Sequence, residues 1–389
     1  MIPYGQHEVT DSDVEAVVRV LKSNFLTQGP IVPEFEAAIS KYCNSKYAIA
    51  MNSATSALHA ACLALELGPG DILWTTPISF VASANCGLYC GAQIDFVDID
   101  PLTNNISVAE LERKLIESKA SGKLPKILVA VHLGGLSCDM QVISKLSLDF
   151  GFRIIEDASH AIGAKYNGLS VGSSIYSDVT IFSFHPVKLI TTAEGGMAVT
   201  NDSSIANRLR LLRSHGITRD PERMSRADKG PWYYEQVELG YNYRMSDLNA
   251  ALGLNQLGRL DDYLKKRNEI ATYYDYHFND LPITRPAPMQ GYYSAYHLYI
   301  VRLKLDKSKL DRQFVFNYLR NEGIGVNLHY IPIHLQPYYQ SLGFQRGDYP
   351  EAEKYYTEAM TLPIYPTISI SELNYIILKF KELLINCGE

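Results

Sequence analysis

Short runs of apolar and β-branched residues alternate with segments of helical periodicity through the first two-thirds of the chain. The runs cover residues 47–51, 71–77, 94–99, 126–132, 152–157, 178–184 and 196–201. Several segments between them carry helix start signals, such as Ser107 three residues before Glu110, a pattern in which side chains satisfy free amides of the first turn. This alternation predicts an α/β fold with a largely parallel sheet covered on both faces.

The pattern changes after a long helical segment around residues 260–278. A strand-like run at 297–305 is followed by a helical segment at 310–323, an extended segment at 326–333 and helices near 350–360 and 371–385. These elements predict a smaller α+β domain. The chain has 389 residues, enough for a large domain plus a smaller one. We place the large domain at residues 1–260, with the N-terminal segment included, and the small domain at 261–389.

Composition and charge narrow the function classes. Apolar residues make up 47% of the chain and charged residues 20%, which is typical of folded globular proteins. The net charge of −6 argues against a nucleic-acid partner, because phosphate binding favours a basic surface. The apolar runs are too short for a membrane span, and the N-terminus lacks signal-peptide character. The cysteines show no metal-ligand spacing. We expect a cytoplasmic protein without a metal, nucleic-acid or membrane partner.

Two charged residues follow predicted strands, at the edge where open α/β sheets bind ligands. The run at 152–157 ends in Asp157, which could pair with a cation or a protonated ring nitrogen, or simply cap the next helix. Lys188 follows the run at 178–184 and is either a solvated charge or a catalytic amine. Ser183 and the pair Gly195 and Gly196 surround it with a hydroxyl and freely placed amides that suit a phosphate.

A second phosphate-binding feature follows the run at 47–51. Ser53, Ala54 and Thr55 stand at the start of a helix, where free amides bind anions, although Ser and Thr are also ordinary caps. Phe80 follows another strand and either stacks on a flat cofactor or belongs to the core. A lysine, an aspartate, a helix N-terminus and an aromatic face together fit pyridoxal 5'-phosphate (PLP), with Lys188 as covalent anchor and general acid/base.

The chain also resembles a known family over nearly its whole length. The matching blocks, in order, are "LTQGP", "NSATSAL", "TTPISFVASAN", "EDASHAIGAKYNG", "FSFHPVKLITTAEGGM", "RSHGI", "GYNYRMSDLNAALGLNQL" and "HYIPIHLQPYY". They resemble the DegT/StrS family of PLP-dependent nucleotide-sugar aminotransferases. The resemblance implies PLP-dependent transferase fold type I, the aspartate aminotransferase-like fold, with a mixed, mostly parallel sheet in the large domain.

The resemblance also implies roles for individual residues. Lys188 would be the Schiff-base lysine and Asp157 the partner of the pyridinium nitrogen. Asn242 would reach the cofactor of a neighbouring subunit, which makes the protein a homodimer with shared sites. His160 stands where many members carry a glutamine near the cofactor hydroxyl. The remaining cofactor contacts implied by the family are Ser183, Ala54 and Thr55 at the phosphate and Phe80 on the ring.

Four of the blocks look most like the pseudaminic-acid branch of the family. That branch moves the amino group of L-glutamate to C4 of UDP-2-acetamido-2,6-dideoxy-β-L-arabino-hexos-4-ulose. The alternatives are an aminotransferase for the D-xylo isomer or another nucleotide 4-keto or 3-keto sugar, and a PLP-dependent sugar dehydratase. Those dehydratases carry histidine in place of the lysine, so Lys188 argues against them. A non-catalytic regulator on the same fold is a further alternative, although no DNA-binding domain is visible.

Candidate substrate contacts lie in four segments of the chain. The segment at 219–234 interleaves cations with aromatic residues that could clamp a diphosphate and stack on uracil, although its acidic residues also suit a solvated loop. The "HYIPIH" segment offers a histidine and a tyrosine, for which a buried structural role is equally compatible. The candidates are Thr27, Arg219, Arg226, Arg244, His329 and Tyr330.

Overall fold

The computed structural model describes residues 1–389 except 227–228, 287–288, 305–310 and 387–389. Its centre is a seven-stranded sheet in the order β1-β9-β8-β5-β4-β2-β3. Four pairs, from β3 to β8, are parallel, whereas β9 runs antiparallel to both β8 and β1. The predicted sheet is thereby confirmed. Its strands are β1 (Tyr47–Met51), β2 (Ile72–Thr75), β3 (Gln93–Phe96), β4 (Ile127–Val131), β5 (Arg153–Asp157), β8 (Val179–Ser183) and β9 (Gly196–Thr200).

Helices cover both faces of this sheet because alternate residues of each strand point to opposite sides. Ile49 packs on one face and Ala48 on the other, and both are buried. The face of Ile49 is covered by α3 (Ala54–Ala64), α4 (Ala82–Tyr89) and α7 (Ser203–Arg213). The opposite face is covered by α2 (Ile31–Cys43), α5 (Val108–Ser121), α6 (Met140–Phe150), α8 (Asp247–Leu257) and the start of α9 (Leu260–His277).

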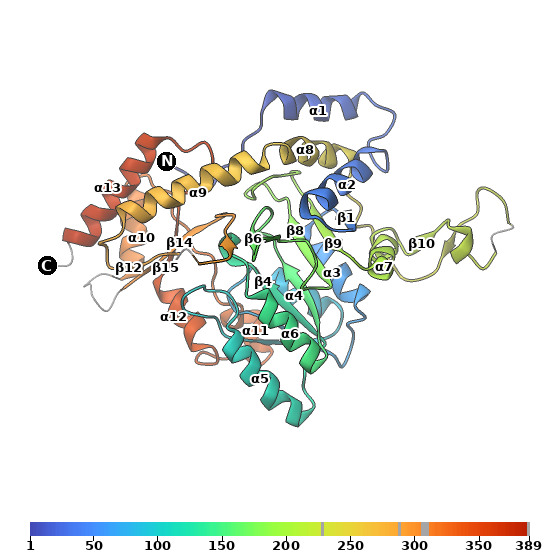
Figure 1. Ribbon diagram of the computed structural model, residues 1–389, viewed down its shortest axis with the longest axis horizontal. Coiled ribbons are helices and arrows are strands. Elements are labelled where there is room, and N and C mark those ends of the chain that lie inside the picture. Colours follow the sequence, from blue (N-terminus) through green and yellow to red (C-terminus); the bar gives the residue numbers. More distant parts are fainter. Residues whose placement is uncertain (227–228, 287–288, 305–310, 387–389) are drawn as a thin grey trace.

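A second core lies around a three-stranded antiparallel sheet in the order β12-β14-β15 (Figure 1). The strands are β12 (Ile283–Thr284), β14 (Tyr299–Leu303) and β15 (Ala359–Leu362), packed with α10 (Arg312–Asn321) and α13 (Ile370–Asn386). Helix α9 joins both cores, since Leu264 packs in the large one and Tyr274 in the small one. The division at residue 260 stays a prediction.

The small region differs from the prediction in two places. The helix expected near 350–360 ends earlier, as α12 (Pro350–Glu358), because the next residues pair with β14 as β15. The segment expected to be extended at 326–333 contributes an isolated bridge from Asn327 to Thr361 and no strand of its own. Residues 305 and 310, at the ends of two predicted elements, lie outside the described part.

The remaining elements lie around the two cores. Helix α1 (Asp11–Leu21) lies along α8, and a hairpin of β10 (Ile217–Thr218) and β11 (Glu235–Gln236) belongs to an arm that projects from the body (Figure 1). Strands β6 (Lys165–Tyr166), β7 (Leu169–Ser170) and β13 (Tyr292–Tyr293) form a small sheet, and α11 (Pro337–Ser341) is a short helix. Among the described residues, no helix is long and apolar enough to cross a membrane.

Candidate active site

A cavity of about 440 Å³ lies where several strands of the central sheet end. The N-terminus of α3 reaches it after β1, the segment from Ser79 to Ala82 after β2, and the residues that follow β5 and β8 from the middle of the sheet. The small region adds two side chains from the segment after residue 328. The predicted site residues that line this cavity are Ala54, Thr55, Phe80, Asp157, His160, Ser183, Lys188, His329 and Tyr330.

Lys188 lies in the loop that reverses the chain between β8 and β9. Its amide donates to the carbonyl of His185 at 2.9 Å, and the loop closes where the Phe184 amide donates to the Gly195 carbonyl at 2.9 Å. Burial lowers the pKa of the Lys188 amine to about 8, while the charge of Asp157 acts in the opposite direction. Roughly one-tenth of the amine is therefore neutral at pH 7, and the neutral amine is the nucleophilic and proton-accepting form.

Asp157 ends β5 with its carboxylate held by protein donors. Ser83 donates to Oδ2 at 2.6 Å, and the hydroxyl and amide of Ser159 donate to Oδ1 at 2.6 and 3.2 Å. The Ser79 hydroxyl lies 2.7 Å from that of Ser83, which extends the network. Turns and no helix follow Asp157, so it does not cap a helix. These donors orient a buried carboxylate toward the cavity, and a cationic ring nitrogen is the partner that this arrangement suits.

The N-terminus of α3 forms the second wall. Ser53 caps the helix, with its hydroxyl accepting from the Ser56 amide at 3.0 Å, as the capping alternative predicted. The amides of the first turn, at Ala54 and Thr55, stay available for an anion. Gly196 lies directly behind them, and a Cβ at this position would be 2.4 Å from the Ala54 nitrogen. Gly196 is therefore required by the close approach of two backbones.

Aromatic and imidazole rings form the remaining wall. Phe80 is 59% exposed, with its ring centroid 6.3 Å from that of Tyr330, so it lies at the mouth and not in the core. His160 is buried with its ring centroid 4.5 Å from that of His297, and burial lowers the pKa of His160 well below its ordinary value. His329 contacts Thr361 through Nδ1 at 2.9 Å, and burial lowers its pKa to about 4.

Five predicted site residues lie outside this cavity. Thr27 forms a bridge with Ser246, and the exposed Asn242 forms one with Ser214. The remaining three are arginines. The Arg244 guanidinium donates to the Ser214 hydroxyl at 3.2 Å, that of Arg219 lies 5.9 Å from the Tyr234 ring centroid, and Arg226 is exposed. Asn242 is still close to the cavity wall, because its carbonyl accepts from the Asn52 side chain at 3.4 Å.

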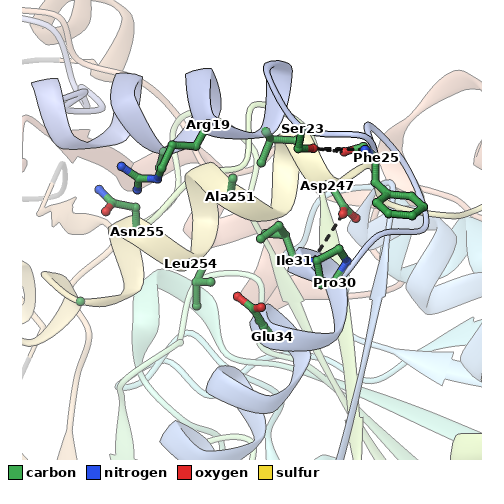
Figure 2. Close-up of a pocket in the computed structure, with 13 residues that line it drawn as sticks. Arg19, Ser23, Phe25, Pro30, Ile31, Glu34, Asp247, Ala251, Leu254 and Asn255 are labelled. Carbon is green, nitrogen blue, oxygen red and sulfur yellow. Dashed lines mark hydrogen bonds between the residues drawn. The ribbon is translucent and has the colours of Figure 1, made fainter.

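A second cavity, of about 600 Å³, lies between α1, α2 and α8 (Figure 2). Its charged groups are Arg19, Glu34 and the buried Asp247, whose Oδ2 faces the Ile31 amide at 3.4 Å. None of the predicted site residues lines it, and it lacks the lysine that covalent cofactor binding requires. Within the described residues, no group of His, Cys, Asp and Glu side chains is arranged to hold a metal ion.

The family model of the DegT/DnrJ/EryC1/StrS aminotransferases matches residues 7–381. The chain belongs to this family. This aminotransferase is 39% identical over 97% of its length, and 96% of the relative, to the UDP-4-amino-4,6-dideoxy-N-acetyl-beta-L-altrosamine transaminase of Campylobacter jejuni strain 81-176. It is 36% identical to the spore coat polysaccharide biosynthesis protein SpsC of Bacillus subtilis over 98% of this chain and 97% of that one.

Solved structures agree with this assignment. Spr1654 of Streptococcus pneumoniae, solved in PLP- and PMP-forms, is 31% identical, and its PMP-form has a TM-score of 0.90 with 100% of both chains covered. PseC of Helicobacter pylori, an aminotransferase involved in the biosynthesis of pseudoaminic acid, has a TM-score of 0.90 at 31% identity over 99% of both chains. The protein is a PLP-dependent sugar aminotransferase of fold type I, and the cavity fits that cofactor: it combines a partly neutral lysine, an oriented aspartate and a helix N-terminus.

Sequence reasoning missed several contributors to the cavity. Ser79 and Ser83 belong to "TTPISFVASAN", in which Phe80 was the one predicted site residue. Ser79 lines the cavity and Ser83 donates to Asp157, and Tyr4 reaches the cavity from the N-terminal segment. A buried serine in an otherwise apolar helix is a usable signal, because a buried hydroxyl needs a partner. No comparable local signal marks Tyr4, whose ring lies 5.3 Å from that of His329 through tertiary packing alone.

Proposed function

We propose that the protein transfers the amino group of L-glutamate to C4 of UDP-2-acetamido-2,6-dideoxy-β-L-arabino-hexos-4-ulose, as a cytoplasmic homodimer with shared active sites. The observation that carries this proposal is the cavity that joins Lys188 and Asp157 in a chain 39% identical to a transaminase named for the corresponding amino sugar. The likeness to PseC supports the same substrate class.

The site residues have distinct roles in this proposal. Lys188 would hold the cofactor covalently, and its amine, once freed by the amino donor, would accept and return a proton at Nζ. Asp157 holds the ring nitrogen, and its serine donors keep the carboxylate oriented. Ser183 and the α3 amides at Ala54 and Thr55 hold the phosphate, and Phe80 covers one ring face. When bound, PLP supplies the electron sink for the carbanion of the amino-bearing carbon.

Substrate binding in this proposal uses both subunits. His329 and Tyr330 line the cavity of their own chain. Arg219 and Arg226 lie between β10 and β11, in the arm that projects from the body (Figure 1). Neither lines the cavity, so we assign them to the diphosphate of a neighbouring subunit's substrate. Thr27 and Arg244, which also lie outside the cavity, are assigned to the neighbouring subunit's substrate as well. Asn242 would instead reach the neighbouring subunit's cofactor.

The experiment that tests the proposal separates the cofactor from the substrate. Borohydride reduction of the PLP-loaded protein, followed by peptide mass spectrometry, should place the cofactor mass on Lys188, and Lys188→Ala should lose both the adduct and turnover while still folding. In a separate experiment, unreduced PLP-loaded protein is mixed with L-glutamate and with either the L-arabino or the D-xylo UDP-4-keto sugar. NMR of the products should show amine at C4 of the L-arabino sugar. Preference for the D-xylo isomer would contradict the substrate, and an adduct elsewhere would contradict the site.

A further inference from the structure

His160 has both ring nitrogens engaged by the protein, so it cannot offer a free nitrogen to a ligand. Nδ1 lies 3.2 Å from the Gly134 amide nitrogen, and Nε2 lies 3.1 Å from the Tyr330 hydroxyl oxygen. The ring is 5% exposed, packs on His297 with the ring centroids 4.5 Å apart, and lines the cavity of Lys188. Hydrogen bonding by His160 therefore reaches a ligand only through one of these two partners.

The hydrogen-bond network fixes the tautomer of His160. A backbone amide can only donate, so Nδ1 must accept from Gly134 and carry no proton. Burial keeps the ring neutral by lowering its pKa, with the charge of Lys188 acting in the same direction. A neutral imidazole with a bare Nδ1 carries its proton on Nε2. The Nε2–H group therefore donates to the Tyr330 oxygen, and not the reverse.

The Tyr330 hydroxyl thus accepts a hydrogen bond from His160, and its own proton remains available for donation. Burial raises the pKa of Tyr330, and the charge of Asp157 adds to that effect, so the hydroxyl stays protonated. In the part of the chain that the structure describes, no group accepts this proton, because the one bonded partner, His160, is itself the donor. The side chain lines the cavity of Lys188, and its ring centroid lies 6.3 Å from that of Phe80.

We propose that His160 is a positioning residue that presents the Tyr330 hydroxyl as a hydrogen-bond donor to an oxygen of the ligand bound beside Lys188. The acceptor is a phenolate, hydroxyl or carbonyl oxygen, supplied either by the cofactor ring or by the sugar. This inference rests on the proposed function of the cavity. It assigns His160 an indirect part, in place of the direct cofactor contact that the sequence suggested.

Two matched substitutions test this geometry. His160→Gln keeps a donor nitrogen near the position of Nε2, whereas His160→Asn keeps only an acceptor near the position of Nδ1. The third variant is Tyr330→Phe, and the fourth combines it with His160→Asn. For each we would measure the dissociation constant of pyridoxamine 5'-phosphate, which binds without a covalent link, and then KM and kcat for the keto sugar. Circular dichroism would confirm folding.

We expect Tyr330→Phe and His160→Asn to impair the same one of these constants, either the pyridoxamine 5'-phosphate dissociation constant or KM or kcat for the sugar. The change should be about three- to tenfold, as for one hydrogen bond, and the double variant should match Tyr330→Phe alone. His160→Gln should restore most of the loss. A changed dissociation constant assigns the acceptor oxygen to the cofactor, and a changed KM or kcat with an unchanged dissociation constant assigns it to the sugar. Multiplicative losses in the double variant, or no effect of Tyr330→Phe on any quantity, would overturn the proposal.

A direct measurement keeps the proposal testable if His160→Asn does not fold. The ¹⁵N shifts of labelled histidine in the wild-type protein, assigned with His160→Gln, report which ring nitrogen carries the proton. We expect a protonated Nε2, and a protonated Nδ1 would refute the inference. Failure of the proposed function is distinguishable from these outcomes, because it would appear as wild-type protein that does not bind the pyridoxamine probe or transfer an amine.

Discussion

The lowered pKa of Lys188 predicts how cofactor capture by the apoprotein depends on pH. With a pKa of about 8, roughly one-tenth of the amine is neutral at pH 7 and about nine-tenths at pH 9. Because the neutral amine attacks the cofactor aldehyde, the rate should rise about tenfold over this interval and level off above pH 9. An ordinary lysine, with a pKa near 10.4, would give a rise of about a hundredfold without levelling.

Stopped-flow mixing of apoprotein with PLP, followed by absorbance between pH 7 and 9.5, measures this rate above the range in which the cofactor phosphate titrates. Lys188→Ala is the control and should show no covalent capture at any pH. Asp157→Asn adds a test of sign: the charge of Asp157 raises the pKa of the amine, so its removal should move the midpoint to lower pH. A wild-type rate that still climbs tenfold per pH unit at pH 9 would refute the reasoning.

Three further predictions concern the walls of the cavity. Gly196→Ala should weaken pyridoxamine 5'-phosphate binding at least about tenfold, because the new Cβ displaces the first amide of α3. The control Gly68→Ala, with nothing within 4 Å of a new Cβ, should leave binding unchanged. Equal dissociation constants for the two variants would contradict the packing argument. Ser83→Ala should lower the free energy of unfolding, measured by urea titration, by about 1.5–3 kcal/mol and should also lower kcat, because it removes a donor to the buried Asp157 carboxylate. An unchanged free energy of unfolding would contradict this prediction. The pKa of His329 is about 4 in the folded state and near 6.5 when unfolded, so the unfolded chain binds more protons between these values. Stability should therefore be fully present above pH 6.5 and fall toward pH 4, by up to about 1.4 kcal/mol per pH unit, and His329→Gln should flatten that slope in urea titrations.

Local patterns were sufficient to locate the strands of the central sheet. The predicted run at 47–51 coincides with β1, and that at 152–157 exceeds β5 by one residue, because a buried strand is apolar on both faces and ends at a polar residue. The same patterns placed Asp157 and Lys188 after strand ends. Since β5 and β8 are neighbours in the sheet, these two residues line one cavity.

Contacts set by the order of strands could not be read from local periodicity. Ser83 reaches Asp157 because β2 lies two positions from β5, which places the start of α4 over the end of β5. His297, two residues before β14, packs on His160, and nothing in either segment signals the pairing. The first two residues of β15 were predicted as the end of a helix, and the pairing of this strand with β14 decided its conformation.

The antiparallel strand β9 has a consequence for how the protein is made. In the described chain β9 is the one strand that pairs with β1, with Tyr47 opposite Thr200, and a single bridge joins Met51 to Arg244. The first strand of the sheet therefore has no neighbour until about half of the polypeptide exists. The helix that offers its amides to an anion follows β1, and the lysine precedes β9. We therefore expect chains that are truncated before residue 196 to lack a formed cofactor site. A growing chain should bind the cofactor only after more than half of it has been synthesised.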